Sequence, residues 1–140
     1  GPGDTVFSTN HLVIQNTAEG GAGVWIFIAG DDLYSSDATA KCPFTNALDI
    51  KQMEYQAVSG TYFHDWSLMP RYDNNAGCTI DRCYADIDNS LPVTAGEEAD
   101  EVNRIVGSGQ TIDVYFKLTY PVPCTGIFDQ GTLYIFAKAV

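Results

Sequence analysis

The chain has 140 residues, of which 7 are basic and 18 acidic, so its formal net charge at pH 7 is −11. A field of that sign repels phosphate groups, which argues against nucleic acid and anionic membrane as partners and favours divalent cations. The hydrophobic content of 45% is typical of a globular protein, and no apolar run reaches transmembrane length. We therefore expect one folded domain without membrane insertion.

Residues 1–16 begin the chain as an extended segment, in which Leu12–Asn16 is short and apolar. The glycine-rich stretch Glu19–Gly23 predicts a turn, because glycine adopts positive φ at little cost. Val24–Ala29 is apolar on both faces, which predicts a central strand covered on both sides. A polar loop, Gly30–Asp37, follows it.

The stretch Asn46–Ser59 changes its alternation partway. Leu48 and Ile50 fall on one parity and Met53 falls on the other. A change of parity moves side chains to the opposite face of a sheet, so we expect a bulge or a break between two short strands near Lys51.

Thr61–Leu68 alternates again and is predicted to be one strand, ended by Pro70. One face of this strand would carry Tyr62, His64, Trp66 and Leu68. Residues 71–96 are irregular. Thr94–Arg104 is the one plausible helix, although Val102–Val106 fits a strand equally well.

The end of the chain has the clearest period of two. Apolar side chains occupy every second position and alternate with the residues between them. These apolar residues are Ile112, Val114, Phe116, Leu118 and Tyr120. Such alternation predicts a half-buried strand, and a last strand follows from Leu133 to the end of the chain. Roughly seven or more short strands with glycine and proline turns predict an antiparallel β-sandwich. We expect it to form a single domain over residues 17–140, with at most one short helix.

Four cysteines in so short a chain are the pattern of a secreted domain with two disulfides, which predicts an extracellular or cell-surface location. They are Cys42, Cys78, Cys83 and Cys124. Three pairings exist for four cysteines. In one of them Cys78–Cys83 closes a tight loop and Cys42–Cys124 joins an early loop to the final hairpin. A zinc site is the rival interpretation, but zinc ribbons have two close cysteine pairs and this chain has one.

Two acidic clusters are candidate calcium sites. Asp86, Asp88, Ser90 and Glu97 have the spacing of ligands in an EF-hand loop, with Thr94 at a further ligand position. The glycine of that loop is replaced by Leu91, and no flanking helices are evident, so a solvated acidic loop is the favoured interpretation. Asp31, Asp32 and Asp37 form the second cluster. No cofactor is required, but Ca²⁺ between subunits would neutralise acids on a self-associating protein.

We do not expect an enzyme. His64 and Asp65 are triad residue types, yet neighbours on a strand point to opposite faces and cannot act on one atom. An aromatic platform for sugars would use Trp25, Tyr62, Trp66 and Tyr115. Core packing explains most of these rings more simply.

Four stretches carry a resemblance to a known group. They are a first strand ending at Asn16-Thr17, a tryptophan-containing strand running into Gly30-Asp31-Asp32-Leu33, the stretch Leu48–Tyr55, and the last 30 residues. This layout resembles secreted archaeal Ig-like surface proteins, including TasA/camelysin-like filament subunits and the pili, threads and cannulae built by donor-strand exchange. The resemblance implies an Ig-like sandwich, with a jelly-roll arrangement as the alternative.

The same resemblance implies a structural role in which each subunit completes the sheet of the next. Gly3–Asn16 would be the donated segment, with Val6, Phe7, Leu12 and Ile14 as anchors. We therefore expect a self-polymerising subunit of an extracellular filament, tube or surface layer. The alternative is a cell-surface binding module for carbohydrate or an S-layer, with calcium as an optional ligand.

Overall fold

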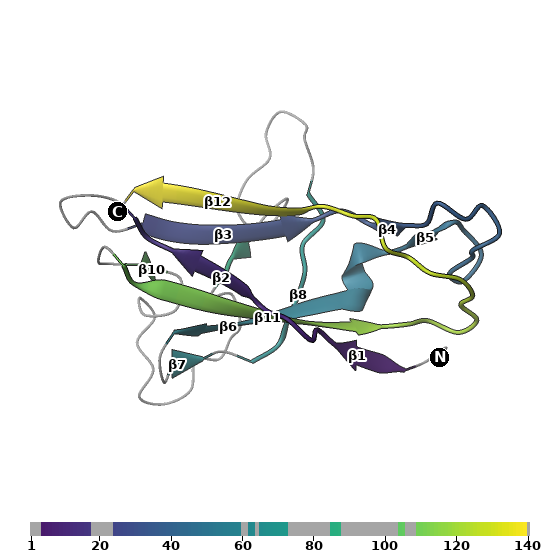
Figure 1. Ribbon diagram of the computed structural model, residues 1–140, viewed down its shortest axis with the longest axis horizontal. Coiled ribbons are helices and arrows are strands. Elements are labelled where there is room, and N and C mark those ends of the chain that lie inside the picture. Colours follow the sequence, from purple (N-terminus) through teal and green to yellow (C-terminus); the bar gives the residue numbers. More distant parts are fainter. Residues whose placement is uncertain are drawn as a thin grey trace.

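The computed structural model describes residues 4–17, 24–59, 62–63, 65–72, 85–87, 104–105 and 109–139. These residues form short antiparallel strands and one 3₁₀ turn, which confirms the predicted all-β class (Figure 1). The finer Ig-like arrangement stays a prediction. Within the described residues, no helix has the length and apolar character needed to cross a membrane.

The larger sheet has six strands, built around β11 (Thr111–Thr119) and β6 (Met53–Ser59), which pair with each other. β1 (Thr5–Phe7) and β2 (Leu12–Gln15) both pair with the other edge of β11. β7 (Tyr62–Phe63) and β8 (Ser67–Leu68) both pair with the far edge of β6.

The smaller sheet is centred on β3 (Val24–Gly30), as predicted for a strand that is apolar on both faces. β12 (Leu133–Ala139) pairs along the whole of β3 on one side. β9 (Ala85–Asp86) and β10 (Arg104–Ile105) pair with β3 on its other side. A separate pair joins β4 (Leu33–Tyr34) to β5 (Ala47–Leu48).

The main core lies between the two sheets. Alternate residues of β3, β6 and β11 point into it, because successive side chains on a strand face opposite ways. Its buried members are Ile26, Ile28, Ile50, Tyr55, Ala57, Met69, Ile87, Ile112 and Val114. The predicted alternation of β11 is thus confirmed at Ile112 and Val114.

A second, smaller core lies at the loop end of the molecule. Its buried members are Ala40, Cys42, Leu48 and Phe128. Cys42 and Cys124 form a disulfide within this core. The disulfide therefore links two loops covalently within this core.

The chain crosses from one sheet to the other over residues 69–72. Met69 N–H donates to Met53 O at 3.0 Å, on the side of β6 away from β11. Gly30 N–H donates to Pro70 O, and Tyr72 N–H donates to Gly30 O, both at 2.9 Å, on the side of β3 away from β12. Because this crossing links one side of both sheets, the opposite edges, β12 and β1–β2, lie together on the other side.

The predicted break near Lys51 is confirmed as a 3₁₀ turn, Ile50–Gln52, with Asp49 as its N-cap. Its Oδ1 accepts a hydrogen bond from Lys51 N–H at 2.9 Å. The prediction of one strand over Thr61–Leu68 is wrong. β7 and β8 are separate, Leu68 is exposed, and Met69 is buried in its place, because the parity changes between the two short strands.

Candidate functional site

The candidate site is the edge of the larger sheet formed by residues 4–15, which we call the N-terminal edge. Thr5–Phe7 pairs with Lys117–Thr119, and Leu12–Gln15 pairs with Thr111–Val114. The two short strands therefore lie end to end along the whole of β11. Ser8 joins them to it, since its N–H donates to Phe116 O at 2.9 Å and its Oγ accepts from Phe116 N–H at 3.3 Å.

Three of the four predicted anchors face the core. Val6 pairs with Leu118, Leu12 with Val114 and Ile14 with Ile112, and directly paired residues share one face of a sheet. Leu12 and Ile14 pack against the main core, whereas Val6 is 49% exposed. Phe7 lies on the outer face instead, because it directly follows Val6 on the strand.

An apolar groove runs beside β1, with a volume of about 200 Å³. Its lining residues are Val6, Phe7, Ser8, Met53, Phe116, Lys117, Leu118 and Tyr120. Most of its surface is apolar. The N-terminal edge therefore covers the core incompletely at this end.

Phe7 is held on the outer face by a tryptophan. Its ring meets Trp66 edge to face, with the ring centroids 5.7 Å apart. Lys117 Nζ lies 4.7 Å from the centroid of the same tryptophan ring and 3.4 Å from Glu54 Oε2. The contact between Phe7 and Trp66 joins side chains alone, and Phe7 is exposed, so we expect it to contribute modestly to holding β1 on the sheet.

His11 lies between β1 and β2 and stacks on Tyr115, with the ring centroids 4.7 Å apart. Its Nε2 is 3.5 Å from Asp113 Oδ1. Two residues of the predicted aromatic platform, Trp66 and Tyr115, lie on this face, and each contacts a neighbouring side chain. For Trp25 and Tyr62 only the backbone is described.

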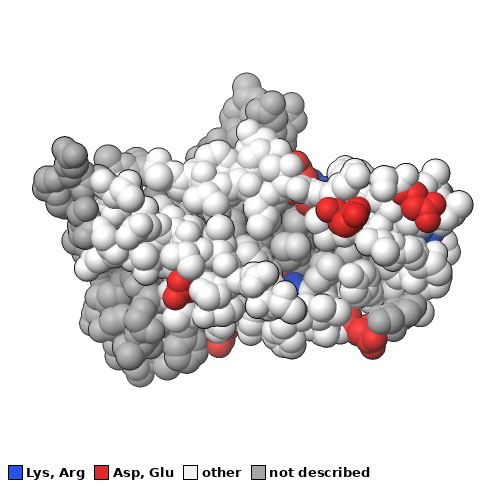
Figure 2. Space-filling view, viewed as in Figure 1, with Lys and Arg blue, Asp and Glu red and all other residues white. Residues whose placement is uncertain are grey.

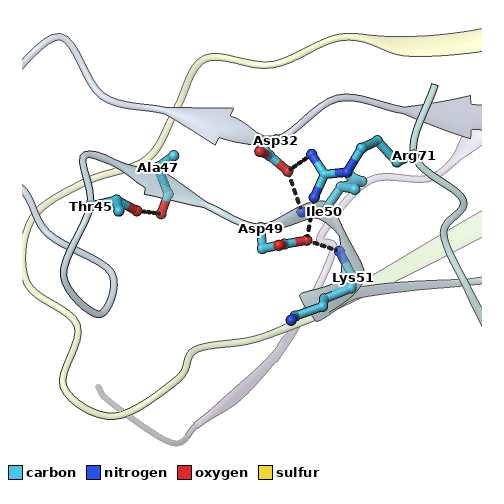
Figure 3. A network of polar contacts seen from close by, with 7 residues as sticks. All are labelled: Asp32, Thr45, Ala47, Asp49, Ile50, Lys51 and Arg71. Atoms are coloured by element: carbon cyan, nitrogen blue, oxygen red, sulfur yellow. Dashed lines mark hydrogen bonds and ion pairs between the residues drawn. The ribbon is translucent and has the colours of Figure 1, made fainter. Parts of the chain in front are cut away.

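A polar network lies where the chain leaves the smaller sheet (Figure 3). Arg71 Nη1 donates to Asp32 Oδ1 at 2.6 Å, and its Nη2 donates to Asp49 Oδ1 at 2.8 Å. Asp32 Oδ1 also accepts from Ile50 N–H at 2.8 Å. A hollow of about 330 Å³ adjoins the network and is lined by both aspartates. The single positive charge of Arg71 pairs with both carboxylates, so the arrangement fits a structural clasp.

The three acids of the Asp31, Asp32 and Asp37 cluster have different partners. Asp31 Oδ2 accepts from the Tyr134 hydroxyl at 2.8 Å, and this bond is the main reason that the pKa of Tyr134 is raised. Asp37 accepts from both the hydroxyl and the backbone N–H of Thr39, which lowers the pKa of Asp37. Among the described residues, no three metal-ligating side chains come together.

The EF-hand candidate lies largely outside the described residues. Asp86 belongs to β9 through its backbone, whereas Asp88, Ser90 and Glu97 fall outside, as do Cys78 and Cys83. These assignments stay predictions. The Cys42–Cys124 disulfide is present and is compatible with an oxidising compartment.

Two features of the site were not predicted from the sequence. The contact of Phe7 with Trp66 is one of them, since Phe7 was predicted only as an anchor of the donated segment. The clasp made by Arg71 was missed altogether, because its aspartates are 39 and 22 residues away in the sequence. The one sequence feature that could have indicated the clasp is an arginine directly after Pro70.

No protein-family model matches the chain, and no curated protein or solved structure was found to match it.

Proposed function

We propose that this protein is a structural subunit of an extracellular filament, tube or surface layer, assembled by donating its N-terminal edge to a neighbouring copy. One observation carries the proposal. Residues 5–15 occupy the full edge of β11 as an added strand, through three residue pairs of β1 and four of β2.

The edge can leave without breaking the pairing between the other described strands. All three residues of β1 are exposed, and among the described strands both β1 and β2 pair with β11 alone. The stretch Glu19–Gly23, which follows it in the sequence, contains three glycines, the residue type with the widest range of backbone conformations.

If residues 5–15 left β11, they would expose surfaces that a neighbouring copy must then cover. The outer backbone groups of β11 and the apolar groove beside Phe116 and Leu118 would both become exposed. The same segment of another copy can restore the same pairs, so exchange need not reduce the number of residue pairs on β11. Because donor and acceptor are different surfaces, repeated exchange builds an open chain of subunits.

Cysteine pairs test the exchange directly. Thr5 Oγ1 and Thr119 Oγ1 are 3.0 Å apart across the sheet. We expect a mixture of the Thr5→Cys and Thr119→Cys variants to form cross-linked heterodimers on a non-reducing gel. The matched control mixes Thr5→Cys with Thr111→Cys, which pairs with Gln15 at the other end of β11 and should not cross-link.

The double variant Thr5→Cys/Thr119→Cys provides the reverse experiment. Its internal disulfide would lock β1 onto its own chain, so electron microscopy should show no polymers. Deletion of the residues before His11 should likewise leave a folded monomer. Filaments formed by the locked protein would rule out strand donation, and imaging with and without millimolar calcium would test the ion.

A further inference from the structure

β12 is an edge strand with little of the usual protection, since Lys138 is its one charged residue. It pairs with β3 over seven consecutive residues, and β3 is its one partner among the described strands. Its sequence, Leu-Tyr-Ile-Phe-Ala-Lys-Ala, contains no proline and no acid, and its register has no bulge. Proline, charge and bulges are the devices that keep sheet edges from pairing with other chains. β12 is therefore open to a further strand.

The hydrogen bonds of Gly30 show which backbone groups point outward. Its N–H and C=O bond to Pro70 and Tyr72, on the side away from β12. Gly30 and Leu133 therefore form a non-hydrogen-bonded pair, and the groups of Leu133 also point away from β3. By alternation, Ile135 and Ala137 present their N–H and C=O to the same free edge.

The side chains of these same residues form a partly exposed apolar row. Ile135 pairs with Ile28, so both lie on the core-facing side of the sheet. Ile28 is fully buried, whereas Leu133 is 39% and Ile135 is 37% exposed. Ala137 is also exposed. The core-facing side of β12 is thus only partly covered.

We propose that β12 pairs antiparallel with β12 of a second copy, about a two-fold axis at Ile135. In this register Ile135 opposes its own equivalent and Leu133 opposes Ala137, so the outward backbone groups of both copies meet. The apolar rows of the two copies then lie side by side. An isologous contact of this kind needs one self-complementary surface, which β12 supplies.

A second copy can occupy this edge because β12 itself carries no negative charge. Two chains of charge −11 repel each other, and β12 contains one charged residue, Lys138, and no carboxylate. In Figure 2 the visible acidic side chains lie apart from the middle of β12. Contact along this strand therefore brings few carboxylates together.

The other face of β12 is also self-complementary. Tyr72 stacks on Tyr134 with centroids 4.0 Å apart, and Phe136 lies 6.5 Å from Tyr134 at an interplanar angle of 14°. In the two-fold register Tyr134 opposes Phe136 of the second copy. Cross-strand aromatic pairs stabilise a sheet, so the pairing would extend the stack across both chains.

This contact goes beyond strand donation and does not depend on it. Donation joins different surfaces and propagates, whereas the β12 contact joins identical surfaces and closes as a dimer. If either strand donation or the β12 contact is disproved, the other proposal is unaffected.

Oxidative cross-linking tests the register. Residue 135 lies on the two-fold axis, so Ile135→Cys should give a disulfide-linked dimer on a non-reducing gel, since opposed residues have Cα atoms about 5.5 Å apart. Leu133→Cys is the matched control, because residue 133 is equally exposed but opposes residue 137. Equal cross-linking of both variants, or of neither, would overturn the proposal.

Sedimentation of the full chain tests the backbone contact. Ile135→Pro removes an outward N–H without touching the bonds to β3, whereas Ile135→Ala keeps the N–H. We expect the proline variant to weaken dimerisation at least about tenfold more than the alanine variant. A dimer unaffected by proline, or one lost when Thr5→Cys/Thr119→Cys locks the N-terminal edge, would refute the β12 contact. If the proline variant does not fold, cross-linking of the Ile135→Cys and Leu133→Cys variants tests the β12 contact instead.

Discussion

Arg71 joins segments of the chain that are far apart in sequence. Its guanidinium donates to Asp32 and to Asp49, and both carboxylates also accept a backbone N–H of the 3₁₀ turn. The Asp32 side chain is 19% exposed and that of Asp49 is 39% exposed. Lower exposure makes loss of an acceptor more costly, because water replaces the lost partner less completely.

We expect Asp32→Ala to lower the free energy of unfolding by about 1–2 kcal/mol and Asp49→Ala by about half as much. Urea denaturation followed by circular dichroism measures both. Arg71→Ala, which removes an ion pair to each acid, should fall between them, and added salt should reduce its effect. Equal losses for the two aspartates would show that burial does not set the strength of the clasp.

At the scale of elements, the loop end depends on one close approach between two connections. Gly126 has φ +100°, and a Cβ there would overlap the Cβ of Ala40 and lie 2.9 Å from its Cα. Lys41 and Thr125 also exchange backbone hydrogen bonds at 3.0 and 2.8 Å. The two loops thus approach as closely as paired strands.

Substitutions at two glycines distinguish the stability cost of backbone strain from the cost of this close approach. Gly109 has φ +86° and no atom within 4 Å of a built Cβ, so Gly109→Ala should cost about 1–2 kcal/mol through strain alone. Gly126→Ala adds the clash and should cost at least about 1 kcal/mol more. Thermal denaturation of both variants checks the difference. Similar losses would mean that the loops separate easily.

The strands that could be predicted are those whose pattern is local. Alternation in β11 and the doubly apolar β3 indicated both elements correctly, because each pattern reflects burial of that strand alone. The parity change near Lys51 located the 3₁₀ turn for the same reason. Leu68 and Met69 were misassigned because a two-residue strand has too few residues to establish a period.

The candidate site could be predicted only in part. The resemblance named Val6, Phe7, Leu12 and Ile14 as anchors, and their role stays a prediction. The contact of Phe7 with Trp66 was not predicted, because Trp66 is distant in sequence. Leu133 and Ile135 were expected in a closing strand, and they do face inward. Their exposure follows from the order of strands in two sheets, which is a long-range property that no local pattern contains.

At the scale of the whole molecule, one bridge closes most of the chain into a loop. Cys42 and Cys124 are separated by 82 residues, which include β5 to β11. A disulfide across so long a loop restricts the unfolded chain strongly, by about 4–5 kcal/mol in the chain-entropy estimate. Its native contacts are those of the small core, where Cys42 is buried with Leu48 and Phe128.

The Cys42→Ala/Cys124→Ala variant separates these two contributions. We expect it to lower the free energy of unfolding by about 3–5 kcal/mol and to raise the denaturant dependence, because an uncrosslinked unfolded chain exposes more surface. Val122→Ala, next to the bridge but 70% exposed, is the control and should change stability by less than about 0.5 kcal/mol. A loss of stability at constant denaturant dependence would assign the effect to packing in the small core. The bridge would then act on the folded loops, and the two sheets would owe their stability to the main core alone.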